Sequence, residues 1–377
     1  RANGVTALRT IATGPKSKLF GSVVGGLGIV TVSFILSFYA IVSGWMLAFL
    51  LQPIADVAGL EALSDWLTVD GILRNSIFVI SFMLLTIFII SAGVKEGIEK
   101  WATRLMPSLV LILVLLIGYV FTLPGAMEGL RAYLVPDFTV FAKPGLLVSA
   151  MGQAFFSLSL GVGTMLVYGS YISKNENLPV IGSLVALLDV GIAVLAGLLI
   201  LPAMYVALAS GVEIFDAQGG LIAGPGLIIS VLPALFDNMG AIGGFVAFAF
   251  FALMTIASLT SSISMLEVPV SFVVESQGVR RPAAAMLLGS IIAVISLVIV
   301  FNFDLLFEWV VTVTTEMSQP LLGLFFCLFT GWIWNRSAIL EEIKQGSPQA
   351  ASGFFWRVWP FYIRFICPAA IIIVYLQ

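Results

Sequence analysis

Polar residues that could bind a cation lie inside long apolar segments of this chain. Asp189 stands among Leu, Val and Ala residues, and its segment contains no basic residue. A charged side chain is costly inside a membrane, so it indicates a function, and an unpaired carboxylate attracts a cation. The alternative is a protonated Asp189 that is hydrogen-bonded to a neighbouring helix.

Two hydroxyls in another apolar segment offer a second candidate cation site. Thr260 and Ser261 follow Ala257 by three and four positions, so the Ala257 carbonyl and both hydroxyls can share one helical face. Neutral oxygens suit Na⁺, although such hydroxyls often only bond back to the preceding turn. Tyr39 lies near the middle of the first apolar segment, where its phenol can donate to a carboxylate or simply pack.

The segment from residue 152 to residue 164 predicts an interrupted helix. Ser157, Ser159, Gly161 and Gly163 fall in the middle of an apolar stretch that is long enough to cross a membrane. Unpaired backbone groups at that depth are tolerated only where they are packed in protein or line a watery cavity. Broken helices of this kind expose carbonyls and helix ends to ions and substrates in secondary transporters.

Composition indicates an integral membrane protein. The chain of 377 residues is 60% hydrophobic and 10% charged, and its mean hydropathy is +1.13. It has no histidine, and its two cysteines, Cys327 and Cys367, show no pairing pattern, so metal or histidine catalysis is not expected. A net charge of -3 with dispersed basic residues argues against binding of nucleic acid.

Hydropathy predicts nine membrane spans, and the distribution of charge predicts their orientation. The first residues, 1–18, are basic without an acid, which places them in the cytoplasm, and an odd number of spans places the carboxyl end outside. The connection 211–239 is long enough to hold short helices, as a lid or as a passive link. The predicted spans are 19–51, 75–94, 105–123, 146–172, 179–210, 240–274, 283–301, 305–334 and 354–376.

Three segments of the chain carry recognisable motifs: Phe155-Phe156-Ser157-Leu158-Ser159-Leu160-Gly161-Val162-Gly163, Ser258-Leu259-Thr260-Ser261-Ser262, and Ser91-Ala92-Gly93-Val94-Lys95-Glu96-Gly97-Ile98-Glu99-Lys100. Together these motifs resemble the neurotransmitter:sodium symporter family, and the resemblance runs over essentially the whole chain.

The resemblance implies an all-α integral membrane protein with an inverted-repeat, broken-helix transporter fold. The nine spans then correspond to the third to eleventh of the family, and the first two are absent. The implied parts are a cytoplasmic loop (1–18), the remainder of the first repeat (19–123), a second repeat of five spans whose first is broken near 157–163 (146–334), and an additional span (354–376).

The resemblance also implies a substrate site. Tyr39 matches the residue that hydrogen-bonds the substrate carboxylate, Ile35 lines the pocket one turn earlier, and Phe156 closes over the substrate from outside. Val162 stands where bulkier aromatics are known, which leaves room for a larger apolar side chain. The residues implied to surround the substrate side chain are Ser159, Val162, Ser261 and Met265.

Two sodium sites are implied as well. Ser157 and Asp189 match ligands of the site that touches substrate, and Ala257, Thr260 and Ser261 match the second site. Chloride-dependent members have a neutral residue at the position of Asp189. We therefore expect chloride-independent transport, with Asp189 either permanently ionised or protonated when the site empties.

The resemblance thus implies a sodium-coupled symporter that imports an apolar L-amino acid across the plasma membrane by alternating access. Tyr39 and Phe156 are expected to close it from outside. Tyr171 and Glu267 are at positions where they either close it from inside or serve as ordinary interfacial anchors. Three alternatives stay open: a channel with uncoupled flux, a truncated inactive fragment and, less favoured because no nucleophile–base pair is present, a membrane enzyme. The oligomeric state is not predicted, because apolar surfaces that face lipid and partners look alike.

Overall fold

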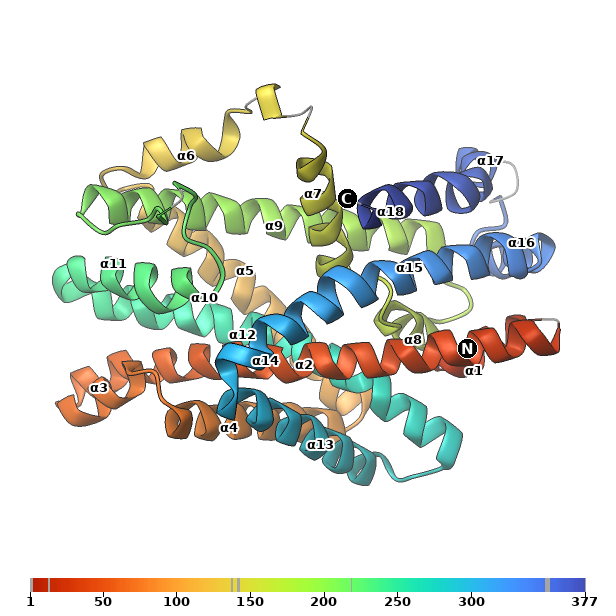
Figure 1. Ribbon diagram of the computed structural model, residues 1–377, viewed down its shortest axis with the longest axis horizontal. Helices are drawn as coiled ribbons and strands as arrows, with labels where there is room; N and C mark the ends of the chain where they lie inside the picture. Colours follow the sequence, from red (N-terminus) through yellow and green to blue (C-terminus); the bar gives the residue numbers. More distant parts are fainter. Residues whose placement is uncertain are drawn as a thin grey trace. The chain divides into compact units, whose positions relative to one another are not determined.

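In the computed structural model the regular secondary structure of the described residues is helical (Figure 1), and the one extended pairing among them is an isolated bridge between Phe215 and Leu221. An all-helical fold is expected for a chain this apolar, because a helix satisfies its backbone hydrogen bonds within one segment. The structure describes residues 3–12, 14–136, 138–140, 143–217, 219–349 and 353–376.

The chain forms two compact units. The first comprises residues 1–38, 138–189 and 263–377, and the second comprises 39–137 and 190–262. Three long helices contribute residues to both units: α2 (Pro15–Val57), α9 (Leu178–Ala209) and α12 (Gly243–Gln277).

The other elements of the first unit are as follows: α1 (Gly4–Ile11), η2 (Phe138–Val140), α7 (Pro144–Ser157), α8 (Thr164–Tyr171), α13 (Arg281–Phe301), α14 (Phe303–Val311), η5 (Thr312–Ser318), α15 (Gln319–Leu328), η6 (Phe329–Ile333), α16 (Arg336–Gly346), α17 (Phe354–Phe361), η7 (Tyr362–Ile366) and α18 (Cys367–Tyr375). In this unit, η5, η6 and η7 are π-helical turns continuous with α-helices.

The other elements of the second unit are as follows: α3 (Glu61–Thr68), α4 (Ile72–Ser91), the π-helical turn η1 (Val94–Glu99), α5 (Lys100–Val120), α6 (Ala126–Leu134), α10 (Gly224–Gly226), the π-helical turn η3 (Leu227–Val231), α11 (Leu232–Asn238) and the 3₁₀ turn η4 (Gly240–Ile242). The connection 211–239, predicted to be long enough for short helices, thus contains α10, η3 and α11.

Eight helices among the described residues are long and apolar enough to cross a membrane. The predicted span 146–172 is not one of them, because it falls on α7 and α8, and each of these is shorter than a membrane crossing. The eight are Pro15–Val57, Ile72–Ser91, Val94–Val120, Leu178–Ala209, Gly243–Gln277, Arg281–Phe301, Phe303–Ile333 and Phe354–Ile373.

Each unit has its own packed apolar clusters. In the first, Leu8 packs with Val24 of α2 and with Leu322 and Phe329 near the end of the chain. In the second, Ala48 and Ala55 of α2 pack with Leu67 of α3 and Phe78 of α4. Large apolar side chains remain exposed along many helices, as a lipid-facing surface requires.

The two cysteines are closer than the sequence suggested. The thiols of Cys327 in α15 and Cys367 in α18 form a side-chain hydrogen bond, and they are not joined by a disulfide. No spacing rule links residues that lie on two separate helices, so a pairing pattern was not visible in the sequence.

Candidate functional site

The interruption between α7 and α8 is built from residues that tolerate a left-handed backbone. Helix α7 ends at Ser157 and α8 begins at Thr164. Between them Gly161 has φ 86°, Gly163 has φ 84°, and Ser159 has φ 50°. Only glycine adopts these angles without cost, so the two glycines stop the helix where the sequence predicts the break.

A serine hydroxyl at the break binds a carboxylate from another helix. The Ser157 Oγ donates to Oδ1 of Asp189 at 2.6 Å. Ser157 is the last residue of α7, and Asp189 lies within α9. The end of α7 therefore positions the Ser157 hydroxyl beside the Asp189 carboxylate. The pair therefore presents a carboxylate oxygen and a hydroxyl oxygen at one point, and both are oxygen ligands of the kind that a hard cation prefers.

The predicted polar residues of α12 make two contacts in the second unit. Thr260 Oγ1 donates to the Ala257 carbonyl at 2.9 Å, which is the back-bonding that serine and threonine commonly make in membrane helices. The same contact brings both oxygens to one face of α12. Ser261 forms a side-chain hydrogen bond with Tyr39, so the phenol and this hydroxyl also lie together.

Apolar residues predicted to line the substrate pocket are buried in the first unit. Ile35, Val162 and Met265 are all buried. A Cβ added at Gly28 of α2 would lie 3.5 Å from the backbone of Val162, so α2 packs closely on the interrupted segment. Ile35 is two turns after Gly28 and shares its face of α2.

Phe156 and Ser159 are less enclosed than these residues. Phe156 is half-buried and borders a cavity of about 750 Å³, which is also lined by Phe38, Gln153 and Glu316. Ser159 is half-buried within the break. A partly exposed ring beside a cavity can move, whereas the buried side chains cannot do so without repacking.

A buried acid lies at the other end of α12. Glu267 has no exposed surface, and it accepts hydrogen bonds from the Tyr171 hydroxyl and from Arg281, with which it also forms an ion pair. One turn away, the Tyr168 hydroxyl lies 3.0 Å from Ser264 Oγ. The carboxylate is thus fixed from α8 and α13, and Glu267 is not an exposed interfacial anchor.

Sequence reasoning missed Arg281, Tyr168 and Gln319. Arg281 begins α13 directly after a short turn, and a buried glutamate with no base in its own segment is the signal that could have found it. Gln319 donates from Nε2 to the Phe155 carbonyl at 2.7 Å. No local pattern predicts that contact, because 164 residues separate the two partners.

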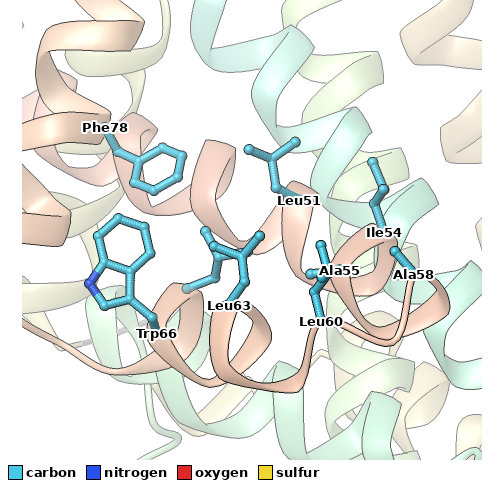
Figure 2. A pocket seen from close by; sticks show the side chains of 9 residues that line it. Leu51, Ile54, Ala55, Ala58, Leu60, Leu63, Trp66 and Phe78 are labelled. Atoms are coloured by element: carbon cyan, nitrogen blue, oxygen red, sulfur yellow. The ribbon is translucent and has the colours of Figure 1, made fainter.

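Other cavities have a different chemistry. Figure 2 shows one of about 330 Å³ in the second unit, where Leu51, Leu63, Trp66 and Phe78 point toward one another. Its lining is wholly apolar, so it offers an ion no ligand. A third cavity, of about 440 Å³, is bordered by Asp56 and Asp237.

The comparisons with known proteins identify the family. A model described as "Sodium:neurotransmitter symporter family" matches residues 59–377. The chain belongs to this family, so it is a multi-pass membrane transporter coupled to sodium and not an enzyme.

One relative and one solved structure cover the whole chain, and a second relative covers about three quarters of it. An uncharacterized sodium-dependent transporter of Bacillus subtilis (strain 168), YhdH, is 31% identical over 397 residues, which cover 100% of this chain and 83% of the relative. The sodium-dependent serotonin transporter of Drosophila melanogaster is 28% identical over 305 residues, which cover 76% of this chain and 46% of the relative. The crystal structure of MhsT in complex with L-phenylalanine matches with a TM-score of 0.83 and 32% identity, covering 100% of this chain and 84% of that one.

Proposed function

We propose that this protein imports a hydrophobic L-amino acid together with sodium, by alternating access and without chloride. The hydrogen bond from Ser157 to Asp189 at the helix break carries the proposal. It joins a fixed carboxylate to the end of an interrupted helix, which is the arrangement that transporters use to bind an ion beside their substrate.

The carboxylate accounts for the proposed independence of chloride. Asp189 supplies a full negative charge within the site, so Na⁺ binding needs no second anion to balance it. Ala193, one turn further along α9, has no side-chain oxygen. In this proposal the charge is built into the chain, and Asp189 is either ionised throughout or protonated when the site empties.

The proposed substrate class follows from the apolar side chains. Ile35, Val162 and Met265 would contact the substrate side chain, and Val162 is small enough to leave room for an aromatic or branched one. Ser159 and Ser261 are proposed as further residues that contact the substrate. The Tyr39 hydroxyl would donate to the substrate carboxylate, and the match to a structure that holds L-phenylalanine supports this class.

A second sodium ion would bind on α12. Its proposed ligands are the Ala257 carbonyl and the hydroxyls of Thr260 and Ser261. Ion binding there would compete with the bond from Thr260 to Ala257, which costs little because one hydrogen bond contributes about 1 kcal/mol net. Each charge moved through 100 mV then supplies about 2.3 kcal/mol, enough for at least a tenfold accumulation of substrate.

The proposed topology has nine crossings, of which the interrupted pair α7 and α8 forms one. The basic residues before α2 would lie in the cytoplasm, and the helices would be organised as inverted repeats. Phe156 and Tyr39 would close the outer side. Tyr171 and Glu267, which are hydrogen-bonded to each other, would close the inner side.

The test is uptake by the full-length protein in proteoliposomes. We expect an imposed sodium gradient to drive accumulation of labelled apolar amino acids when gluconate replaces chloride. Uptake that occurs only with chloride would keep the transport proposal and overturn the role of Asp189. Sodium flux that continues at the same rate without any amino acid would favour a channel instead.

A further inference from the structure

Gln319 is a buried polar residue that contacts the interrupted helix from another part of the chain. It is the first residue of α15, and only 1% of its surface is exposed. Its Nε2 donates to the Phe155 carbonyl at 2.7 Å. Phe155 lies two residues before Ser157, so Gln319 holds the backbone of α7 just before the residue that binds Asp189.

Two glycines bring the backbones of α15 and the break into contact. A Cβ at Gly161 would overlap the Gln319 carbonyl oxygen, and a Cβ at Gly323 would overlap the Phe155 ring. Gly323 lies one turn after Gln319 on the same face of α15. Three contacts thus join the first turn of α15 to residues on both sides of Ser157, which leaves this part of the break little room to shift.

The amide of Gln319 can make its contact in one orientation only. The Phe155 carbonyl also accepts from the Leu160 backbone N–H at 2.9 Å, so it needs a donor from Gln319 and not another acceptor. The Gln319 Oε1 is buried and has no hydrogen-bond partner among the described residues. The opposite orientation would place two acceptor oxygens against each other and leave the Nε2 group unpaired, so the observed one is favoured.

The turn before Gln319 sets its direction. The π-helical turn η5 (Thr312–Ser318) ends at Ser318, the residue directly before Gln319. An extra residue per turn rotates the side chains that follow, and such turns are frequent at functional sites. The π-helical turn is therefore consistent with a need to orient the Gln319 side chain toward the Phe155 carbonyl.

We infer that Gln319 is a positioning residue for the sodium site at Ser157 and Asp189. By holding the Phe155 carbonyl it fixes the last turn of α7 and keeps the Ser157 hydroxyl on Asp189. This inference rests on the proposed function. It adds a residue from α15 that does not itself touch the ion.

The test compares two substitutions with a matched control. Gln319→Met removes the donor at similar length. Gln319→Glu keeps the shape but donates only when the new carboxyl is protonated. Gln345→Glu makes the same chemical change on the exposed surface of α16. Two sodium concentrations are measured. The first gives half-maximal uptake, and the second gives half of the maximal rise in melting temperature of the purified protein.

We expect Gln319→Met to raise both sodium concentrations about tenfold, the effect of losing one buried hydrogen bond, with a smaller change in maximal uptake. Relative to wild type, Gln319→Glu should bind sodium better as the pH falls from about 8.5 to about 5.5, because protonation restores the donor. Gln345→Glu should leave both sodium concentrations unchanged.

Three results would overturn the inference. The first is an unchanged sodium requirement in Gln319→Met. The second is a Gln319→Glu variant whose sodium binding does not improve at low pH, and this result decides alone if Gln319→Met does not fold. The third concerns the wild-type protein. A wild-type protein that shows no sodium response in either assay would overturn the proposed function itself, and the role of Gln319 with it.

Discussion

Arg281 forms an ion pair with Glu267, whose side chain has no exposed surface, whereas 19% of the Arg281 side chain remains exposed. The pair joins the first turn of α13 to the C-terminal part of α12. A buried carboxylate without its partner is strongly destabilising, so the pair constrains which substitutions the protein tolerates.

Arg281→Met is expected to destabilise the protein by about 3–5 kcal/mol, because it leaves the Glu267 carboxylate without its cation. Combining Arg281→Met with Glu267→Leu should cost less than Arg281→Met alone, since no buried charge then remains. Melting temperatures in detergent of the single and double variants measure this difference. A double variant less stable than Arg281→Met would contradict the expectation.

Asp189→Asn is expected to make transport depend on chloride, because the neutral side chain no longer supplies the charge that balances Na⁺. Uptake with chloride and with gluconate measures the change, and a loss of at least tenfold in gluconate is expected. Asp65→Asn, in an exposed position of α3, is the matched control. Full uptake by Asp189→Asn in gluconate would rule out the role proposed for the carboxylate.

Gly161→Ala is expected to destabilise the break, since φ is 86° there and the added Cβ would overlap the Gln319 carbonyl oxygen. A left-handed backbone costs a residue other than glycine about 1–2 kcal/mol before any overlap. Gly26→Ala in α2 is the control, because nothing lies within 4 Å of a Cβ at that position. There the change should stabilise the helix by about 0.5–1 kcal/mol. Equal melting temperatures for the two variants would argue against a strained break.

Asp237→Asn is expected to stabilise the protein at neutral pH. Burial, together with the neighbouring Asp56, raises the pKa of Asp237 above its ordinary value of 3.8. The protonated form is therefore favoured by folding, and this contribution is lost as the pH rises through the raised pKa. The advantage of Asp237→Asn should shrink as the pH falls toward the ordinary value, which melting curves across this range would reveal. A constant advantage at every pH would point to packing instead of charge.

Local features of the sequence predicted much of the helical framework. Apolar length located the spans because a helix crossing hydrocarbon must be apolar along its whole course. It placed the start of one span at residue 105, whereas the helical segment begins at Val94. Lys95, Glu96 and Glu99 make its first turns polar, and a helix can continue beyond the hydrocarbon where hydropathy no longer marks it.

Contacts between distant segments could not be read in the same way. The ion pair of Arg281 with Glu267 and the bond of Gln319 to Phe155 depend on which helices pack together, and hydropathy carries no such information. The contact of Ser157 with Asp189 was expected only through the family resemblance. Single residues of unusual type, such as an acid in an apolar segment, indicated where to look but not what they would touch.

The left-handed glycines on either side of Val162 have an evolutionary consequence. Gly161 and Gly163 have a positive φ, and Val162 between them does not. Mutations at either glycine carry a backbone penalty, so selection should remove them, whereas a substitution at position 162 carries no such backbone penalty and is limited only by packing of the buried side chain. New substrate preferences could then arise by changes at one codon, without renewed selection on the surrounding fold.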